Sequence, residues 1–299
     1  MTSVTEKKSD PLTRLVAWSA VILGGALPFI LWGSPEHWAL LLPLTQAAGL
    51  ALAGFAVLLS ARLRGLSRYL FALAALRLGW CVITPWLSKT PALKDWSDKA
   101  DWGAAFLVAR SLPLAGAILI SMTLIGTGLT RANLFLRPGN LSAPTGPLPI
   151  PGFRKPMPWT RFGPLLLVIF AIVLPLFYCF TARPNFAMAG RIIHFLPWIV
   201  FIAALNAANE EFQFRCVMLA HLRNVLVPAE AILLSAVLFG LLHYYGQPSG
   251  LSGSIMAGFA GWIWARSMIE TRGAAWAFFI HMVQDIVIGC FLAMGVVNK

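Results

Sequence analysis

Charged residues are scarce in this sequence, and acidic residues are the scarcest of them. Charged residues make up only 11% of the 299 positions, and Asp and Glu together number 11. Soluble domains carry about 25% charged residues, so the composition excludes an ordinary soluble domain. Hydrophobic residues account for 59% of the chain, and the mean hydropathy is +0.76. The sequence therefore indicates an integral membrane protein.

The long apolar runs lack the period-two alternation of membrane strands. Backbone hydrogen bonds must be satisfied inside a bilayer, and continuous apolar runs of roughly 20 residues favour helices over a closed barrel. We therefore predict an all-α fold, a polytopic membrane helix bundle with about nine transmembrane spans. The predicted spans are residues 15–33, 39–61, 69–87, 103–129, 164–182, 195–220, 230–246, 254–270 and 275–296.

The sequence also lacks the cysteine spacing of a disulfide framework or a zinc site. Its four cysteines lie within or next to apolar runs and show no CxxC pattern. Buried small hydrophobic side chains are the default interpretation of such residues. We expect neither a disulfide nor a bound metal from Cys81, Cys179, Cys216 and Cys290.

Basic residues outnumber acidic ones and give a formal net charge of +12. They lie mostly in the short connections between predicted spans, which is typical of membrane orientation and of contact with anionic lipid. We therefore expect the lipid bilayer as a partner, and no nucleic acid. The positive-inside rule predicts a cytoplasmic N-terminus, because the loop after the first span carries Glu36 and no basic residue. The basic residues on the predicted cytoplasmic side include Lys7, Lys8, Arg14, Arg131, Arg137, Arg154, Lys155 and Arg161.

A Pro- and Gly-rich stretch, GNLSAPTGPLPIPGFRKPMPW within residues 131–163, divides the chain. It cannot form a regular helix. It separates an N-terminal membrane region, residues 1–130 with about four spans, from residues 164–299, which hold every intramembrane acid. In the N-terminal region, Arg77 and Arg110 interrupt the third and fourth spans. We expect these two side chains to face each other's polar groups or a cavity.

Three polar motifs lie in three different predicted spans of the C-terminal half: NEEFQFR, FGLLH and HMVQD. An acid at the centre of a membrane helix costs at least about 2.5–3.5 kcal/mol. We therefore expect these groups to face one another or water. Glu211 and Arg215 are four residues apart on one helical face and can form an ion pair. Glu210 is rotated by about 100° from Glu211 and can face a cavity.

The other two motifs supply two histidines and a further acid. His281 and Asp285 share one helical face, and Phe239 stacks one turn before His243. A carboxylate in a dehydrated cavity is a stronger base than one in water. We hypothesise that water between Glu210 and His243 attacks a carbonyl. His281 and Asp285 then hold the developing oxyanion.

The ordered motifs resemble those of the CPBP intramembrane proteases, the family of CAAX proteases and bacteriocin-processing enzymes also called Abi. The family pattern is EExxxR, FxxxH and then HxxxN or HxxxD on successive membrane helices. Here it reads EEFQFR, FGLLH and HMVQD, and the resemblance covers about residues 164–297. It implies a CPBP-type core in the C-terminal half of a multi-pass protein of a bacterial cytoplasmic membrane. It also implies metal-independent glutamate proteolysis of a membrane-associated protein or peptide, without a cofactor.

By motif match, the resemblance implies that Glu210 activates water with His243 as its partner. His281 and Asp285 fall at the oxyanion-stabilising positions. The supporting positions are Glu211, Arg215 and Phe239.

One position departs from the pattern of the prenyl-protein proteases. Asp285 stands where those enzymes usually have Asn. Asn donates a hydrogen bond at any pH, whereas Asp donates only when it is protonated. The difference argues against a prenylated CAAX tail as substrate without excluding it. A C-terminal sorting signal and a bacteriocin leader are also open.

Four alternatives remain at this point. GLSG resembles the nucleophile motif of rhomboid proteases, with Ser252 as nucleophile and His281 as base, but this leaves Glu210, Glu211 and His243 unexplained and places Ser252 in a connection of loop-like composition. A zinc-dependent protease would use Glu210 and the two histidines as a His₂Glu ligand set, although HExxH is absent. The other two are a proton-coupled transporter and a non-catalytic membrane protein.

Overall fold

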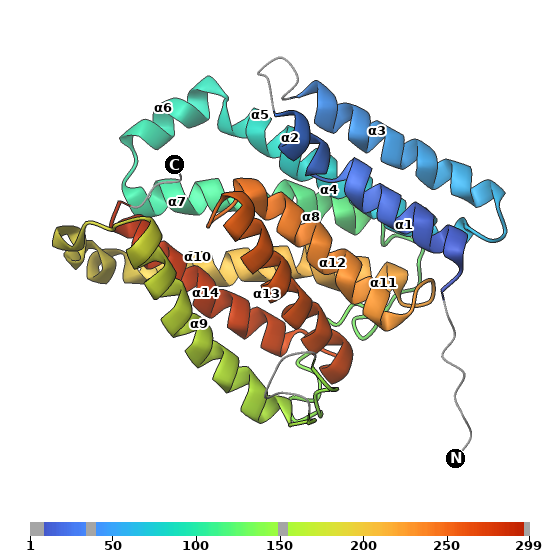
Figure 1. Cartoon of the computed structure of the whole chain (residues 1–299). Helices are drawn as coiled ribbons and strands as arrows, with labels where there is room; N and C mark the ends of the chain where they lie inside the picture. Colours follow the sequence, from blue (N-terminus) through green and yellow to red (C-terminus); the bar gives the residue numbers. More distant parts are fainter. Residues whose placement is uncertain (1–8, 34–39, 149–154, 296–299) are drawn as a thin grey trace.

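The protein is built from helices. The computed structural model describes residues 9–33, 40–148 and 155–295. Within these residues the only strand-like feature is an isolated bridge between Pro144 and Pro158. The α-helices are α1 (Pro11–Gly24), α2 (Leu27–Trp32), α3 (Leu41–Ala56), α4 (Ser67–Leu78), α5 (Thr84–Ser88), α6 (Pro91–Lys99), α7 (Trp102–Ser111), α8 (Leu114–Met122), α9 (Trp159–Thr181), α10 (Gly190–Glu211), α11 (Met218–Leu222), α12 (Pro228–Leu242), α13 (Gly250–Thr271) and α14 (Ala275–Ala293) (Figure 1). The predicted all-α fold is confirmed; Lys7, Lys8, Glu36 and Arg154 lie outside the described residues.

Seven helical stretches of the described residues are long and apolar enough to cross a membrane. They are Leu41–Leu59, Arg64–Ser88, Trp102–Met122, Trp159–Thr181, Gly190–Leu222, Pro228–Tyr245 and Ala275–Ala293. Each overlaps one of the nine predicted spans, so the polytopic helical bundle is confirmed.

The other two predicted spans are helical as well. The first is divided, because α1 ends at Gly24 and α2 begins at Leu27, and α1 is a shorter apolar helix. The eighth corresponds to α13, which is 22 residues long but is not among the seven apolar stretches. Its sequence includes Arg266 and Glu270, which form an ion pair on one face of the helix.

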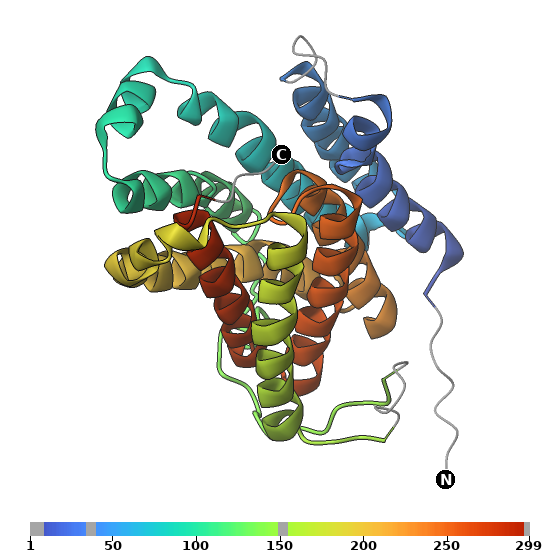
Figure 2. The same cartoon turned by 60° about the vertical axis from the view of Figure 1, so that its left-hand side comes forward.

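The helices form two neighbouring groups. On one side α3 packs on α4 and α4 packs on α8. On the other, α10 packs on α14, α14 on α9 and α13, and α13 on α12. Figure 1 shows α3 at the upper right of the molecule and α9 at the lower left, with α12, α13 and α14 between them. In the turned view of Figure 2, α9 stands in front of α13 and α14. Contacts of α1 with α12 and of α7 with α10 join the two groups.

Local chemistry fixes several helix ends. The Asp10 side chain caps α1 by accepting a hydrogen bond from the Thr13 backbone N–H at 2.9 Å, and Pro11 occupies the first helical position. The Arg62 guanidinium beside Asp10 holds the pKa of that carboxyl below its usual range. This contact joins the start of α1 to the connection before α4.

Two helices that carry the site approach each other unusually closely. A Cβ atom on Gly240 of α12 would lie 2.7 Å from the Ser254 carbonyl oxygen and 3.0 Å from the Gly258 Cα of α13. Only glycine permits this approach. It packs α12 tightly against α13, from which Trp264 reaches the site.

The Pro- and Gly-rich connection is fastened to the turn between α13 and α14. The Asn140 N–H donates to the Thr271 carbonyl oxygen at 2.8 Å. The Glu270 carboxylate accepts from the Gly146 N–H at 2.9 Å and from the Trp159 indole at 2.8 Å. Buried apolar residues from both sides of this connection belong to one hydrophobic cluster. The division of the chain into two regions at this connection therefore stays a prediction.

Candidate active site

The site residues meet at one cavity of about 700 Å³. Its lining comes from both groups of helices: α2, α3, α4, α5 and α7 in the N-terminal region, and α9, α10, α12, α13 and α14 in the C-terminal half. The predicted catalytic residues Glu210, His243, His281 and Asp285 all line it, although they come from three helices. Their roles stay predictions, but the structure places the four side chains together.

The two adjacent glutamates lie at the C-terminal end of α10 and are almost completely buried. Glu210 is 4% exposed and Glu211 is 2% exposed. Directly after them the helix widens into one turn of π-helix, η6 (Phe212–Val217), a feature that often occurs at functional sites. The predicted ion pair is present: Arg215 Nη1 donates to Glu211 Oε1 at 3.0 Å.

Arg215 is enclosed by aromatic rings. Its guanidinium carbon lies 3.8 Å from the centroid of the Phe239 ring and 4.8 Å from that of Trp264. A Cβ atom on Gly261 would lie 2.6 Å from Arg215 Nη2, so α13 leaves room for the guanidinium only because this residue is glycine. A buried charge needs a partner of opposite sign. Glu211 provides it, and the rings add cation–π attraction.

His281 is held on two sides. Its Nδ1 lies 2.8 Å from Glu211 Oε1, and its ring stacks on Trp264 with centroids 4.1 Å apart and an interplanar angle of 13°. This arrangement turns Nε2 toward the other two carboxyl groups. Nε2 lies 3.5 Å from Glu210 Oε2 and 3.6 Å from Asp285 Oδ2. Glu211 therefore does more than neutralise Arg215, because it also orients the imidazole.

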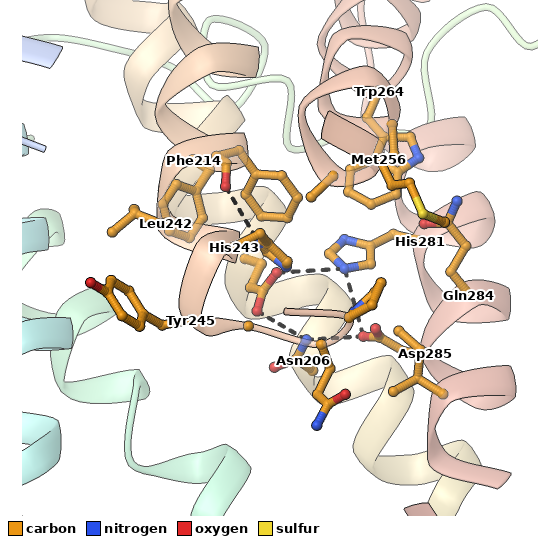
Figure 3. Close-up of a pocket in the computed structure, with 18 of the residues that line it drawn as sticks. Asn206, Phe214, Leu242, His243, Tyr245, Met256, Trp264, His281, Gln284 and Asp285 are labelled. Atoms are coloured by element: carbon orange, nitrogen blue, oxygen red, sulfur yellow. Dashed lines mark hydrogen bonds and ion pairs between the residues drawn. The ribbon is translucent and has the colours of Figure 1, made fainter. Parts of the chain in front are cut away.

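Sequence reasoning missed Asn206, which joins two of the candidate catalytic acids. Its side-chain nitrogen donates to Glu210 Oε1 at 3.1 Å and to Asp285 Oδ2 at 2.9 Å. Figure 3 shows Asn206 below the two histidines and joined by a dashed line to Asp285. Both amide hydrogens are used, so α10 and α14 are joined at the point where the acids lie. The spacing of four residues between Asn206 and Glu210 is the signal that could have revealed it.

His243 approaches the cavity from the end of α12 and begins the short 3₁₀ turn η7 (His243–Tyr245). Its ring packs on Phe239, as predicted, with centroids 4.1 Å apart. Its Nδ1 lies 3.1 Å from the Phe239 carbonyl oxygen. A carbonyl only accepts, so Nδ1 carries the hydrogen and the neutral ring leaves Nε2 as an acceptor. In Figure 3, His243 and His281 extend from separate helices into the same cavity.

A second polar group that sequence reasoning missed ties the glutamate helix to the N-terminal region. Gln213 is fully buried. Its side-chain nitrogen donates to Asn209 Oδ1 at 2.7 Å and to the Pro113 carbonyl oxygen at 3.2 Å. Its oxygen accepts from the Trp80 indole at 2.9 Å. The position of the π-turn is thereby fixed against α8 and the π-turn η4 (Gly79–Ile83) that follows α4.

Two alternative constellations can be compared with the geometry. Ser252 lies in the first turn of α13 and not in a loop, so its predicted location was wrong. Its side chain is exposed and is not among the residues that line the cavity. Across residues 9–33, 40–148 and 155–295, no group of three or more His, Cys, Asp or Glu side chains is arranged to hold a metal ion.

The comparisons with known proteins bear on the segment that carries this site. Residues 192–287 match the family model described as Rce1-like, type II CAAX prenyl endopeptidase Rce1-like. No curated protein and no solved structure matches the chain. The matched segment contains all four candidate catalytic residues and the three supporting ones. The match supports the resemblance to the CPBP and CAAX protease family over this segment, which is less than half of the chain.

Proposed function

We propose that this protein hydrolyses a peptide bond of a membrane-associated protein inside the cavity, with Glu210 and His243 activating a water molecule. The observation that supports this most strongly is the meeting of Glu210, His243, His281 and Asp285 at one cavity. They come from three helices that are far apart in the sequence. Two of them, Glu210 and Asp285, carry carboxyl groups within membrane helices, where acids are costly and generally mark a functional site.

Water activation rests on two acceptors. Glu210 Oε2 has no hydrogen-bond partner among the described residues, and the neutral His243 ring presents Nε2 as an acceptor. A water molecule that donates to both groups keeps a lone pair for a substrate carbonyl. Glu210 then accepts the proton as the new oxygen–carbon bond forms.

The oxyanion position is assigned to His281 and Asp285. Glu211 accepts a hydrogen bond from the Nδ1–H of His281. The Nε2 atom therefore carries a hydrogen, and can donate it to an oxyanion, only when the ring is doubly protonated. We therefore take the His281 ring as doubly protonated. Asp285 can donate a second hydrogen bond when protonated, and Asn206 holds it in place. Donors fixed before the reaction stabilise the tetrahedral intermediate without reorganisation.

The reaction balances without a covalent enzyme intermediate. The water oxygen bonds to the carbonyl carbon, and the water proton passes to Glu210. The carbon–nitrogen bond then breaks, and Glu210 returns the proton to the leaving amine. The products are a new carboxylate and a new amine. Neither a metal nor a cofactor takes part in this proposal.

The membrane context sets the substrate class. Helices long enough to cross a bilayer surround the cavity, so the proposed substrate is an extended, largely apolar segment at or in the membrane. Residues 164–299 form the proposed catalytic core. We further propose that the protein lies in a bacterial cytoplasmic membrane with its N-terminus on the cytoplasmic side.

A comparison of protein termini in the host membrane tests the proposal. Cells carry either the wild type or Glu210→Gln at equal levels. Glu230→Gln serves as the matched control, because Glu230 pairs with Arg14 and does not line the cavity. A new terminus should appear with the wild type and with the control but not with Glu210→Gln. Identical termini in all three strains would contradict proteolysis.

A further inference from the structure

A buried arginine of the N-terminal region lines the same cavity as the catalytic acids. Arg77 lies on α4 and is only 5% exposed. It lies outside residues 192–287, the segment that the family model matches. The proposed hydrolysis does not use it. Its presence in a membrane span is costly and calls for a separate explanation.

Every contact of the Arg77 guanidinium is with an uncharged group. Nε and Nη2 both donate to Gln46 Oε1, at 2.8 and 2.6 Å. Nη1 donates to Cys81 Sγ at 3.0 Å. The guanidinium carbon lies 5.2 Å from the centroid of the Phe29 ring. No carboxylate of the described residues lies within ion-pair distance of it.

The neutral acceptor is itself fixed in orientation. The Gln46 side-chain nitrogen donates to the Leu23 carbonyl oxygen at 2.7 Å and to the Gly25 carbonyl oxygen at 3.0 Å. Its oxygen therefore points at Arg77. Gln46 of α3 therefore holds the guanidinium in one position, and no acid of the described residues compensates its positive charge.

The free donors of Arg77 have a definite arrangement. A guanidinium carries five N–H groups, and three are used by Gln46 and Cys81. One N–H on Nη1 and one on Nη2 therefore have no partner among the described residues. These two donors belong to neighbouring nitrogens of one planar group, and such a pair can bind the two oxygens of a carboxylate.

We propose that Arg77 binds a carboxylate of the peptide substrate, either its C-terminal carboxylate or an acidic side chain. This rests on the proposed function, because it takes the cavity to be the place where a peptide enters. The cavity wall near Arg77 includes Phe29, Trp80 and Pro85, which suit apolar peptide residues. Arg110 also lines the cavity, but it is only half-buried and stacks on Phe106, so it lacks the fixed pair of free donors.

This gives the N-terminal region a role. Its helices α3 and α4 supply a recognition point for the substrate, while α10, α12 and α14 supply the chemistry. A carboxylate bound at Arg77 anchors the peptide at one point of the cavity. The distance from the anchor to the catalytic acids then determines which bond is cleaved.

A binding experiment without hydrolysis tests the proposal. Purified Glu210→Gln protein in nanodiscs is titrated with acetyl-Leu-Ala-Val-Leu as the free acid, with the same peptide as its C-terminal amide, and with acetyl-Leu-Ala-Glu-Leu amide. We expect at least one carboxylate peptide to bind about 10-fold or more tightly than the neutral amide. The first and third peptides distinguish a terminal from a side-chain carboxylate. Equal affinity of all three peptides would overturn the proposal, whether or not the enzyme cleaves anything.

Substitutions in the same background identify the residue. Arg77→Gln should remove the preference for carboxylate and leave binding of the neutral amide unchanged. Arg68→Gln is the matched control, because Arg68 is an exposed arginine of α4 that does not line the cavity. Loss of affinity for all three peptides alike, or a preserved carboxylate preference in Arg77→Gln, would contradict the assignment. Arg77→Lys is the second variant if Arg77→Gln does not fold. A lysine ammonium cannot offer two parallel N–H donors to one carboxylate, so this variant should prefer carboxylate peptides less strongly than the wild type does.

Discussion

The two polar ends of the cavity differ in how their charges are compensated. At the acidic end, Glu211 pairs with Arg215 and His281, while Asn206 links Glu210 to Asp285. All of these groups lie on α10, η6 and α14. At the basic end, the described partners of Arg77 are all neutral: Gln46 of α3, Cys81 of η4 and the Phe29 ring of α2. The acidic end compensates most of its charge internally, as a preorganised catalytic site must. The basic end leaves a charge that an outside partner can satisfy.

The two ends also differ in how tightly their side chains are packed. The acidic end is clamped by rings, since Trp264 stacks on His281 and Phe239 covers Arg215. Its groups cannot move without breaking several contacts. The basic end keeps two free donors at a fixed point in an otherwise apolar wall. Substitutions at the two ends should therefore have different consequences, and the following predictions begin with the largest.

The replacement His243→Gln should lower kcat on a peptide substrate about 10²- to 10⁴-fold. The imidazole supplies the second acceptor for water, and the Gln amide cannot reproduce its basicity. Folding should be kept, because the hydrogen bond and the ring contact that the structure shows for this side chain are both with Phe239 of its own helix. His221→Gln is the control, since His221 is a buried histidine of α11 that does not line the cavity. Equal kcat in the two variants would remove His243 from the mechanism.

Two arginine replacements compare the ends directly through stability. Arg215→Leu removes the arginine that pairs with the buried Glu211 and should cost about 3–5 kcal/mol of unfolding free energy. Arg77→Leu leaves no acid of the described residues without a partner. It removes the hydrogen bonds to Gln46 and should lower the free energy of unfolding by about 1–3 kcal/mol. Unfolding of both variants is measured under the same conditions in nanodiscs. A loss at Arg77 as large as that at Arg215 would show that Arg77 is compensated within the protein.

Removal of the link between the acids should affect catalysis more than binding. Asn206→Leu frees the Glu210 and Asp285 carboxyl groups from their shared donor, and kcat should fall about 10- to 100-fold because small misplacements of reacting groups are costly. KM should change little. Asn209→Leu on the same helix breaks only the contact with Gln213 and should lower stability while sparing kcat. Parallel changes in both variants would assign Asn206 a purely structural role.

The smallest effect concerns packing around the arginine of the acidic end. A Cβ atom at Gly261 would lie 2.6 Å from Arg215 Nη2, so Gly261→Ala should cost about 1–3 kcal/mol of stability. Gly49→Ala is the control, because nothing lies within 4 Å of its added Cβ in α3. That substitution should stabilise the protein by about 0.5–1 kcal/mol through helix propensity. Stabilisation by both would mean that Arg215 is not tightly enclosed.

Much of the fold and part of the site follow from local sequence pattern. Apolar runs predicted the membrane helices, because the bilayer requires a continuous length of apolar residues. Helical spacing predicted the contact of Glu211 with Arg215 and that of Phe239 with His243, because both pairs lie one turn apart on a single helix. These features depend on neighbours in the sequence and need no knowledge of the tertiary structure.

The remaining features depend on how helices meet. Nothing near Trp264 in the sequence shows that its ring stacks on His281 from another helix. Likewise, the bond between Asn206 and Asp285 joins residues 79 positions apart. The main hydrogen-bond partner of Arg77, Gln46, comes from a separate helix as well, so a neutral partner in place of an acid could not be known from sequence. The break at Gly25 and the inclusion of Ser252 in α13 also depended on backbone geometry that hydropathy does not encode.

The most direct test of the account uses purified protein in nanodiscs and a substrate peptide found by the comparison of termini. Cleavage by the wild type and by Glu210→Gln is measured with and without the chelators EDTA and 1,10-phenanthroline. The account predicts an unchanged wild-type rate in the presence of chelator and a loss of at least about 10³-fold for Glu210→Gln. Undiminished cleavage by Glu210→Gln, or cleavage abolished by chelator and restored by zinc, would contradict it.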